Sequence, residues 1–192
     1  IHAHNDTENG VANALAAINS GVRHVQGTIN GLGERCGNTN LVSLIPSLVL
    51  KTDFHTNIEE KNLKSLTKIS NTLSELLNEP KLKNAPYVGE NAFSHKGGLH
   101  ASAVAKDPST YEHIDPDLVG NSRNVIISDQ AGKANLISQL NKLEINIESE
   151  KINQILELIK QKEAEGFSYD TALASFELLV RRHVGQLDEY FN

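Results

Sequence analysis

The feature that most constrains the fold of this chain is an alternation of strand-like and helix-like segments over its first 51 residues. Residues 1–5 and 22–29 have the short, half-apolar pattern of strands. Residues 11–19 and 38–51 carry apolar side chains at helical spacing. A glycine-rich turn at 30–33 separates the second strand-like segment, 22–29, from the second helix-like segment, 38–51. Strand, helix, strand and helix with short connections predict an α/β fold built on a parallel sheet.

The rest of the chain is predicted to be mainly helical. One apolar stripe at helical spacing predicts an amphipathic helix and consists of Ile58, Leu63, Leu66, Ile69, Leu73, Leu76 and Leu77. We read residues 89–98 as a loop and expect a short strand within 118–128. Further helices are expected at 99–106, 132–143, 149–164 and 171–184.

Composition limits the classes of partner. The 192 residues are 39% apolar and 22% charged, as in a globular chain. The net charge, 18 − 24 = −6, argues against nucleic-acid and anionic-membrane partners. The single cysteine, Cys36, fits a reducing compartment, so we expect a cytoplasmic location. Because the chain opens on Ile1 and contains no methionine, we expect a fragment of a longer protein whose N-terminal part is missing.

The sequence His2-Ala3-His4 is the sharpest chemical signal. On an extended strand, residues i and i+2 point to the same side, so both imidazoles can face one metal ion. Asn5 and Asp6 follow where the strand meets its loop, the edge at which parallel α/β folds carry their sites. We therefore predict a metal site here, with two exposed histidines at a frayed chain end as the alternative.

A glycine-rich segment, Asn30-Gly-Leu-Gly-Glu-Arg-Cys-Gly-Asn38, follows the second predicted strand. Its glycines let the backbone approach a ligand closely, and Asn38 offers an amide oxygen, a hard ligand that suits Mg²⁺ or Mn²⁺. Glu34 and Arg35 fit either a catalytic role or a mutual ion pair. Cys36 has no evident base beside it, so we interpret it as structural rather than nucleophilic.

Two polar segments lie farther along the chain. In Phe93-Ser-His95-Lys96-Gly-Gly-Leu-His100, two histidines beside a lysine and two glycines could form an acid/base site, although a solvated loop explains this segment alone more simply. Tyr111-Glu-His113-Ile-Asp-Pro is a further polar cluster to which the sequence assigns no chemistry.

Taken together, these segments resemble the family of alpha-isopropylmalate, homocitrate and citramalate synthases, metal-dependent TIM-barrel enzymes that condense acetyl-CoA with a 2-oxo acid. Residues 2–21, HAHNDTENGVANALAAINSG, are similar to the family's seventh barrel strand and following helix. Residues 25–38, VQGTINGLGERCGN, are similar to its eighth strand and glycine-rich loop. The resemblance covers essentially the whole chain and implies an α/β fold: the last strands and helices of a TIM (β/α)8 barrel, followed by mostly helical linker subdomains.

Within the family, residues 86–123 look most like the citramalate synthase branch. His95-Lys96-Gly97-Gly98 stands where isopropylmalate synthases usually carry a serine-rich loop, and His100 is followed by alanine and serine rather than by Gln-Asp. The domains implied are 1–88, the C-terminal part of the barrel with a flanking helix; 89–146, linker subdomain I; and 147–192, helical linker subdomain II leading to a regulatory domain.

The resemblance also implies a site. His2, His4 and Asn38 match the family's ligands to a divalent metal, which could be Mn²⁺, Mg²⁺, Zn²⁺ or Co²⁺. His100 matches a catalytic histidine that reaches into the neighbouring subunit of a homodimer. The substrate-binding residues that we expect are Asn5, Gly31, Gly33, Glu34 and Arg35. The metal would polarise the ketone of the 2-oxo acid, and acetyl-CoA is the cosubstrate.

The expected reaction condenses acetyl-CoA with pyruvate to give citramalate and CoA, a step in isoleucine biosynthesis. Sister activities, 2-isopropylmalate or homocitrate synthesis, are the alternatives, and the isolated 192 residues should be inactive. A second class, the amidohydrolases, also uses His-X-His on a barrel strand, but on the first strand and with later ligands that this sequence lacks. A third interpretation, compatible with the first, is a dimerisation and linker module without activity of its own.

Overall fold

A computed structural model describes residues 1–95, 98–125, 133–169 and 172–187. The chain forms two compact units. The N-terminal unit comprises Ile1–Phe93 and Ile114–Ser122, and the C-terminal unit comprises Ser94–His113 and the chain from Arg123 onward. Because the chain crosses between the units three times, each unit is built from segments that are not contiguous in sequence.

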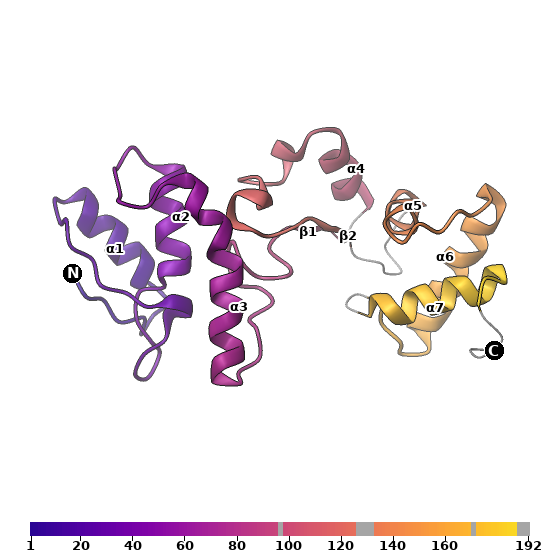
Figure 1. Cartoon of the computed structure of the whole chain (residues 1–192), viewed down its shortest axis with the longest axis horizontal. Coiled ribbons are helices and arrows are strands. Elements are labelled where there is room, and N and C mark those ends of the chain that lie inside the picture. The colour runs from indigo at the N-terminus through magenta and orange to yellow at the C-terminus, as the bar shows by residue number, and fades with distance from the viewer. Residues whose placement is uncertain (96–97, 126–132, 170–171, 188–192) are drawn as a thin grey trace. The chain divides into compact units, whose positions relative to one another are not determined.

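The elements of the N-terminal unit are helical (Figure 1): α1 (Gly10–Asn19), the 3₁₀ helix η1 (Ile29–Gly31), α2 (Leu41–Lys51), the 3₁₀ helix η2 (Glu60–Ser65), α3 (Leu66–Leu77) and the 3₁₀ helix η4 (Pro116–Val119). Those of the C-terminal unit are β1 (Ser94–His95), α4 (Gly98–Lys106), the 3₁₀ helix η3 (Pro108–Thr110), β2 (Asn124–Val125), α5 (Lys133–Lys142), α6 (Ser149–Ala164) and α7 (Leu173–Val184).

The two predicted strands at 1–5 and 22–29 run side by side but form single bridges instead of a continuous ladder. His2 pairs with Gln26 in parallel, as a parallel sheet requires. The segment 37–40, which the sequence did not predict to be extended, pairs with both neighbours. Thr39 N–H donates to the carbonyl of Ala3 at 2.9 Å, and its carbonyl accepts from Thr28 N–H at 3.0 Å. These bonds use backbone groups that a regular ladder between the predicted strands would need.

Helix α2 begins at Leu41 rather than at residue 38, so the predicted start of this helix was wrong. The Asn40 side chain accepts a hydrogen bond from Val42 N–H at 3.0 Å, which caps the helix and sets its first turn. Asn38 therefore lies on extended backbone before the helix. Pro46, which the sequence predicted to disturb the helix, is buried within it, and α2 continues to Lys51.

The apolar stripe predicted as one helix divides into η2 and α3. Leu63 and Leu66 are buried, whereas Ile69 is 46% and Leu76 is 78% exposed. Helix α3 ends where Asn78 takes a left-handed backbone conformation, φ 52°. Leu63 and Leu66 thus belong to the core of the unit, whereas the C-terminal end of the stripe is exposed.

The N-terminal unit has two apolar cores. One lies between α1 and α2 and is centred on Ala14, Ile18 and Leu44. The other joins α2 to the later segments and consists of Val42, Leu63, Leu66, Tyr87, Val88, Phe93 and Val119. Helix α2 contributes to both, so it fixes the segment 37–40 that immediately precedes it.

The C-terminal unit packs α5, α6 and α7 around one apolar core, where Tyr169 and Phe176 meet edge to face at 6.5 Å. All three helices were predicted, and each observed bound lies within two residues of the prediction. The loop predicted at 89–98 instead contains β1, which pairs in parallel with β2. Most of the apolar run predicted as a strand near 125–128 lies outside the described residues.

Over the residues that the structure describes, the chain is rich in helix and has little sheet. No helix within the described ranges is both long enough and apolar enough to cross a membrane.

Candidate functional site

His2 and His4 lie on the same side of the first extended segment, as their spacing predicted. Their ring centroids are 5.3 Å apart and the rings meet at 74°. Both residues are exposed. The backbone of His4 forms an antiparallel bridge with that of Asn38 on the neighbouring extended segment. Residues paired in this way project to the same face, so the two imidazoles and the Asn38 amide share one surface.

Asn38 has the strongest local signature of a ligand. The residue is buried, and its Nδ2 donates to the carbonyl of Leu32 at 3.0 Å. This bond fixes the orientation of the amide, because only nitrogen can donate. Its Oδ1 is buried and has no hydrogen-bond partner. Native proteins rarely leave such an acceptor unsatisfied, and an amide oxygen is an established ligand for hard divalent cations. Together with two imidazoles, this donor set fits a divalent metal.

The described residues contain no group of three or more His, Cys, Asp and Glu side chains that could hold a metal. The set His2, His4 and Asn38 differs from such a group in having a neutral amide as its third member.

The glycines of the 30–38 segment make room for Asn38. A Cβ on Gly33 would overlap the Asn38 amide nitrogen and lie 2.9 Å from the amide carbon. A Cβ on Gly37 would overlap the carbonyl oxygen of Gly31, which accepts from Asn38 N–H at 3.0 Å. Gly31 and Gly37 also have left-handed backbones, φ 70° and 84°. In the structure, Gly31 and Gly33 therefore both pack against Asn38. The Gly31 carbonyl accepts a hydrogen bond from its N–H, and the missing side chain of Gly33 leaves space for its amide.

Arg35 does not pair with Glu34; its guanidinium lies against the His2–His4 face. Nη1 donates to Asp6 Oδ1 at 3.0 Å, and Nη2 lies 3.4 Å from His4 Nδ1. Arg35 and Asp6 are about half exposed, so the guanidinium is accessible to an anionic ligand. Glu34 is exposed in the turn, where its carbonyl accepts from Gly37 N–H. The free thiol of Cys36 is also exposed.

Asn5 links this surface to helix α1. Its Oδ1 accepts from Gly10 N–H at 3.0 Å, at the first residue of the helix. The side chain predicted to bind substrate thus already satisfies a backbone donor at a helix start.

His100 belongs to the C-terminal unit, where it is exposed on α4. Its ring lies 4.3 Å from that of Tyr111, tilted by 32°. His95, from the same sequence motif, is directed elsewhere: its Nε2 lies 3.1 Å from Glu112 Oε1. Lys96 and Gly97 of that motif lie outside the described residues.

Two contacts around these residues escaped the sequence analysis. Asn30 donates through Nδ2 to the carbonyl of Ser70 at 3.0 Å and accepts from the Ser70 hydroxyl at 2.6 Å, which ties the glycine-rich segment to α3. Glu112 is a buried carboxylate that joins His95 to Arg123. The left-handed conformation of Asn30 is typical of asparagine and could have pointed to the first contact. No local signal marks Glu112.

Comparison with known families covers both parts of the chain. Residues 1–73 match the HMGL-like family, and residues 87–166 match the family described as homocitrate synthase post-HMGL domain-like. The two matches follow one another in the order that the sequence motifs predicted. The chain belongs to the isopropylmalate, homocitrate and citramalate synthase family. The HMGL-like match identifies the N-terminal region as part of a TIM barrel and confirms the coarse fold class.

Individual relatives agree with the citramalate branch of this family. The chain is 51% identical to the (R)-citramalate synthase of Aquifex aeolicus, over 100% of this chain and 37% of that protein. It is 47% identical to the (R)-citramalate synthase of Synechocystis, over 100% and 35%. Identity to the 2-isopropylmalate synthase of Methylacidiphilum infernorum is 36%, over 100% and 38%. The chain spans little more than a third of the length of these relatives.

Proposed function

We propose that the protein containing this chain is an acyltransferase that condenses acetyl-CoA with pyruvate to give citramalate and CoA. Five relatives named (R)-citramalate synthase are 42–51% identical to the chain, whereas three relatives named 2-isopropylmalate synthase or probable 2-isopropylmalate synthase are 34–38% identical. This difference supports pyruvate as the 2-oxo acid.

The single structural observation that supports the reaction type is the buried, unpartnered Oδ1 of Asn38, on a residue whose backbone pairs with that of His4, while the rings of His2 and His4 lie together. These three side chains would hold the divalent cation that the family implies. When bound, the cation supplies Lewis acidity to the ketone of the 2-oxo acid. Manganese, magnesium, zinc and cobalt all accept imidazole and oxygen donors, and Mn²⁺ is the ion that we would test first.

The chain's own residues would handle the charges and protons of the reaction. The guanidinium of Arg35, which now pairs with Asp6, would bind the carboxylate of the 2-oxo acid beside the metal face. The remaining substrate contacts would come from Asn5, Glu34 and the backbone at Gly31 and Gly33.

His100, supplied by the partner of a homodimer, would move a proton during condensation. The acetyl methyl group loses a proton to a base, its carbon bonds to the ketone carbon, and the ketone oxygen gains a proton. Water then cleaves the thioester, which releases a carboxylate and the CoA thiol. His100 is exposed even though its ring contacts that of Tyr111. Its imidazole would therefore be accessible to the active site of a partner subunit.

The architecture that we propose follows the same family. Residues 1–88 would complete a (β/α)8 barrel, residues 89–146 and 147–192 would be the two linker subdomains, and the enzyme would work in the cytoplasm. The isolated 192 residues would then lack activity, because most of the barrel is supplied by the rest of the protein. The match of residues 1–73 to the HMGL-like family favours the acyltransferase over the amidohydrolase alternative, which would carry His-X-His on its first barrel strand.

Substitution of His2 by alanine tests the metal assignment in the complete protein. We expect H2A to lose Mn²⁺-dependent release of CoA thiol, because it removes one of the three metal ligands that we assign to this chain. H24A is the matched control, since His24 is also an exposed histidine and lies outside the predicted ligand set. Full Mn²⁺-dependent activity of H2A would contradict the assignment.

A further inference from the structure

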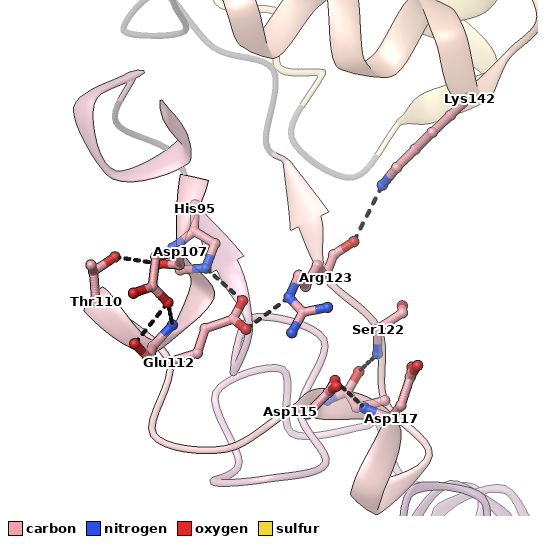
Figure 2. A network of polar contacts seen from close by, with 11 residues as sticks. His95, Asp107, Thr110, Glu112, Asp115, Asp117, Ser122, Arg123 and Lys142 are labelled. Carbon is pink, nitrogen blue, oxygen red and sulfur yellow. Dashed lines mark hydrogen bonds and ion pairs between the residues drawn. The ribbon is translucent and has the colours of Figure 1, made fainter. Parts of the chain in front are cut away.

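The polar cluster at 111–116, to which the sequence assigned no chemistry, contains a buried carboxylate with two basic partners. The Glu112 side chain is 2% exposed. One oxygen lies 3.1 Å from His95 Nε2, and the other accepts from Arg123 Nε at 2.7 Å (Figure 2). A buried carboxylate is costly unless it is paired and hydrogen-bonded, and each of these oxygens has a partner.

The two partners lie on, or directly beside, the two strands of the small sheet in the C-terminal unit. His95 is in β1, and Arg123 immediately precedes β2. The strands pair over only two residues each, Ser94 with Asn124 and His95 with Val125. Such a short parallel pair is not stable by itself. The Glu112 carboxylate therefore acts as a cross-link between the strands, and Lys142 adds a bond from α5 to the Arg123 carbonyl at 3.2 Å.

Glu112 is connected to His100 in two ways, through β1 and through the turn that carries Tyr111. Helix α4, which carries His100, begins three residues after His95 and packs against β1 and η3. Tyr111, whose ring contacts the His100 imidazole, is the residue before Glu112. Asp107 N–H donates to the carbonyl of Ala103 at 2.8 Å, so the turn that carries Tyr111 continues directly from α4. Glu112 thus holds both β1, which precedes α4 in the chain, and the Tyr111 turn, which follows α4.

We propose that Glu112 is a positioning residue for His100. Its carboxylate fixes β1 and the Tyr111 turn, and these two elements fix the direction of the His100 imidazole. This inference rests on the proposed function only in assigning His100 a part in catalysis. Loss of the carboxylate lowers turnover by about ten- to a hundredfold, since a displacement of about 1 Å at a reacting group has effects of this size. The KM for pyruvate stays unchanged because the buried Glu112 carboxylate is already paired with His95 and Arg123.

A double-mutant cycle in the complete protein separates positioning from general stability. The variants are E112Q, H100A and the double variant, and the measured quantities are kcat and the KM for pyruvate. If Glu112 acts through His100, the double variant is no slower than H100A. The matched control is I155V, which alters the fully buried Ile155 of α6 in the same unit, away from β1 and β2. It lowers stability without changing kcat.

A second readout does not depend on activity. In protein with labelled histidines, the ring protons of His100, identified by their absence in H100A, carry an upfield shift from the Tyr111 ring. E112Q removes this shift, and I155V retains it. Should E112Q fail to fold, H95Q gives the same test, because it removes the imidazole and leaves the Glu112–Arg123 pair.

Multiplicative effects of E112Q and H100A on kcat, or an E112Q protein that keeps both its turnover and the His100 shift, would overturn the proposal. If H100A itself retains full turnover, the catalytic role of His100 fails. The ring shift then still decides whether Glu112 positions the imidazole.

Discussion

Replacement of Gly33 by alanine tests whether this glycine serves to place the Asn38 amide. The added Cβ would overlap Nδ2 and lie 2.9 Å from the amide carbon, whereas ordinary van der Waals contact begins at 3.4 Å. The amide must therefore retreat, its nitrogen by about an ångström, and its bond to the Leu32 carbonyl must weaken. Displacement of one ligand by this amount should weaken Mn²⁺ binding by about tenfold, or about 1.4 kcal/mol.

Calorimetric titration of the complete protein with Mn²⁺ measures this change directly. G21A is the control: it makes the same chemical change at a residue where a Cβ would meet nothing within 4 Å, although its φ of +107° disfavours alanine. We expect both variants to lose about 1 kcal/mol or more of stability, and only G33A to lose metal affinity. Unchanged Mn²⁺ affinity in G33A would refute this account of the loop.

Three further predictions concern the two units and the chain as a whole. S70A removes the hydroxyl bond to Asn30 Oδ1 and should lower the free energy of unfolding, measured by urea titration, by about 1–2 kcal/mol. S74A is the control: its contact with Asn30 is 3.4 Å long, so it should change this free energy by less than about 0.5 kcal/mol. F176A removes a fully buried ring from the α5–α7 core and should cost about 3–5 kcal/mol by calorimetry, while L178A, at a residue that is 44% exposed, should cost under 1. The isolated 192 residues should form no citramalate from acetyl-CoA and pyruvate with Mn²⁺, and measurable product would show that the chain holds a complete site.

Local sequence patterns predicted those elements that depend on local interactions. Helices α5 to α7 follow apolar spacing, and turns with glycine in a left-handed conformation follow α6 and α7 at Gly166 and Gly185. His2 and His4 share a face because a strand has a period of two residues, which requires no knowledge of the rest of the fold.

The parts that could not be predicted depend on contacts between distant segments. The extended segment 37–40 is fixed by backbone bonds to Ala3 and Thr28, and no periodicity in its own sequence predicts them. The exposed end of the α3 stripe has an amphipathic pattern whether or not a neighbour covers it. Glu112 reads as a solvated charge, and only its two partners, 17 residues before it and 11 after it, explain its burial.

Substrate choice tests the central claim most directly. The complete protein would be assayed for release of free CoA thiol from acetyl-CoA with Mn²⁺ and, in turn, pyruvate, 2-oxoisovalerate or 2-oxoglutarate. We predict a clear preference for pyruvate, with no turnover when the metal is chelated. Preference for a larger 2-oxo acid would contradict the citramalate assignment while leaving the fold and metal site in place. Metal-independent turnover would contradict the site itself.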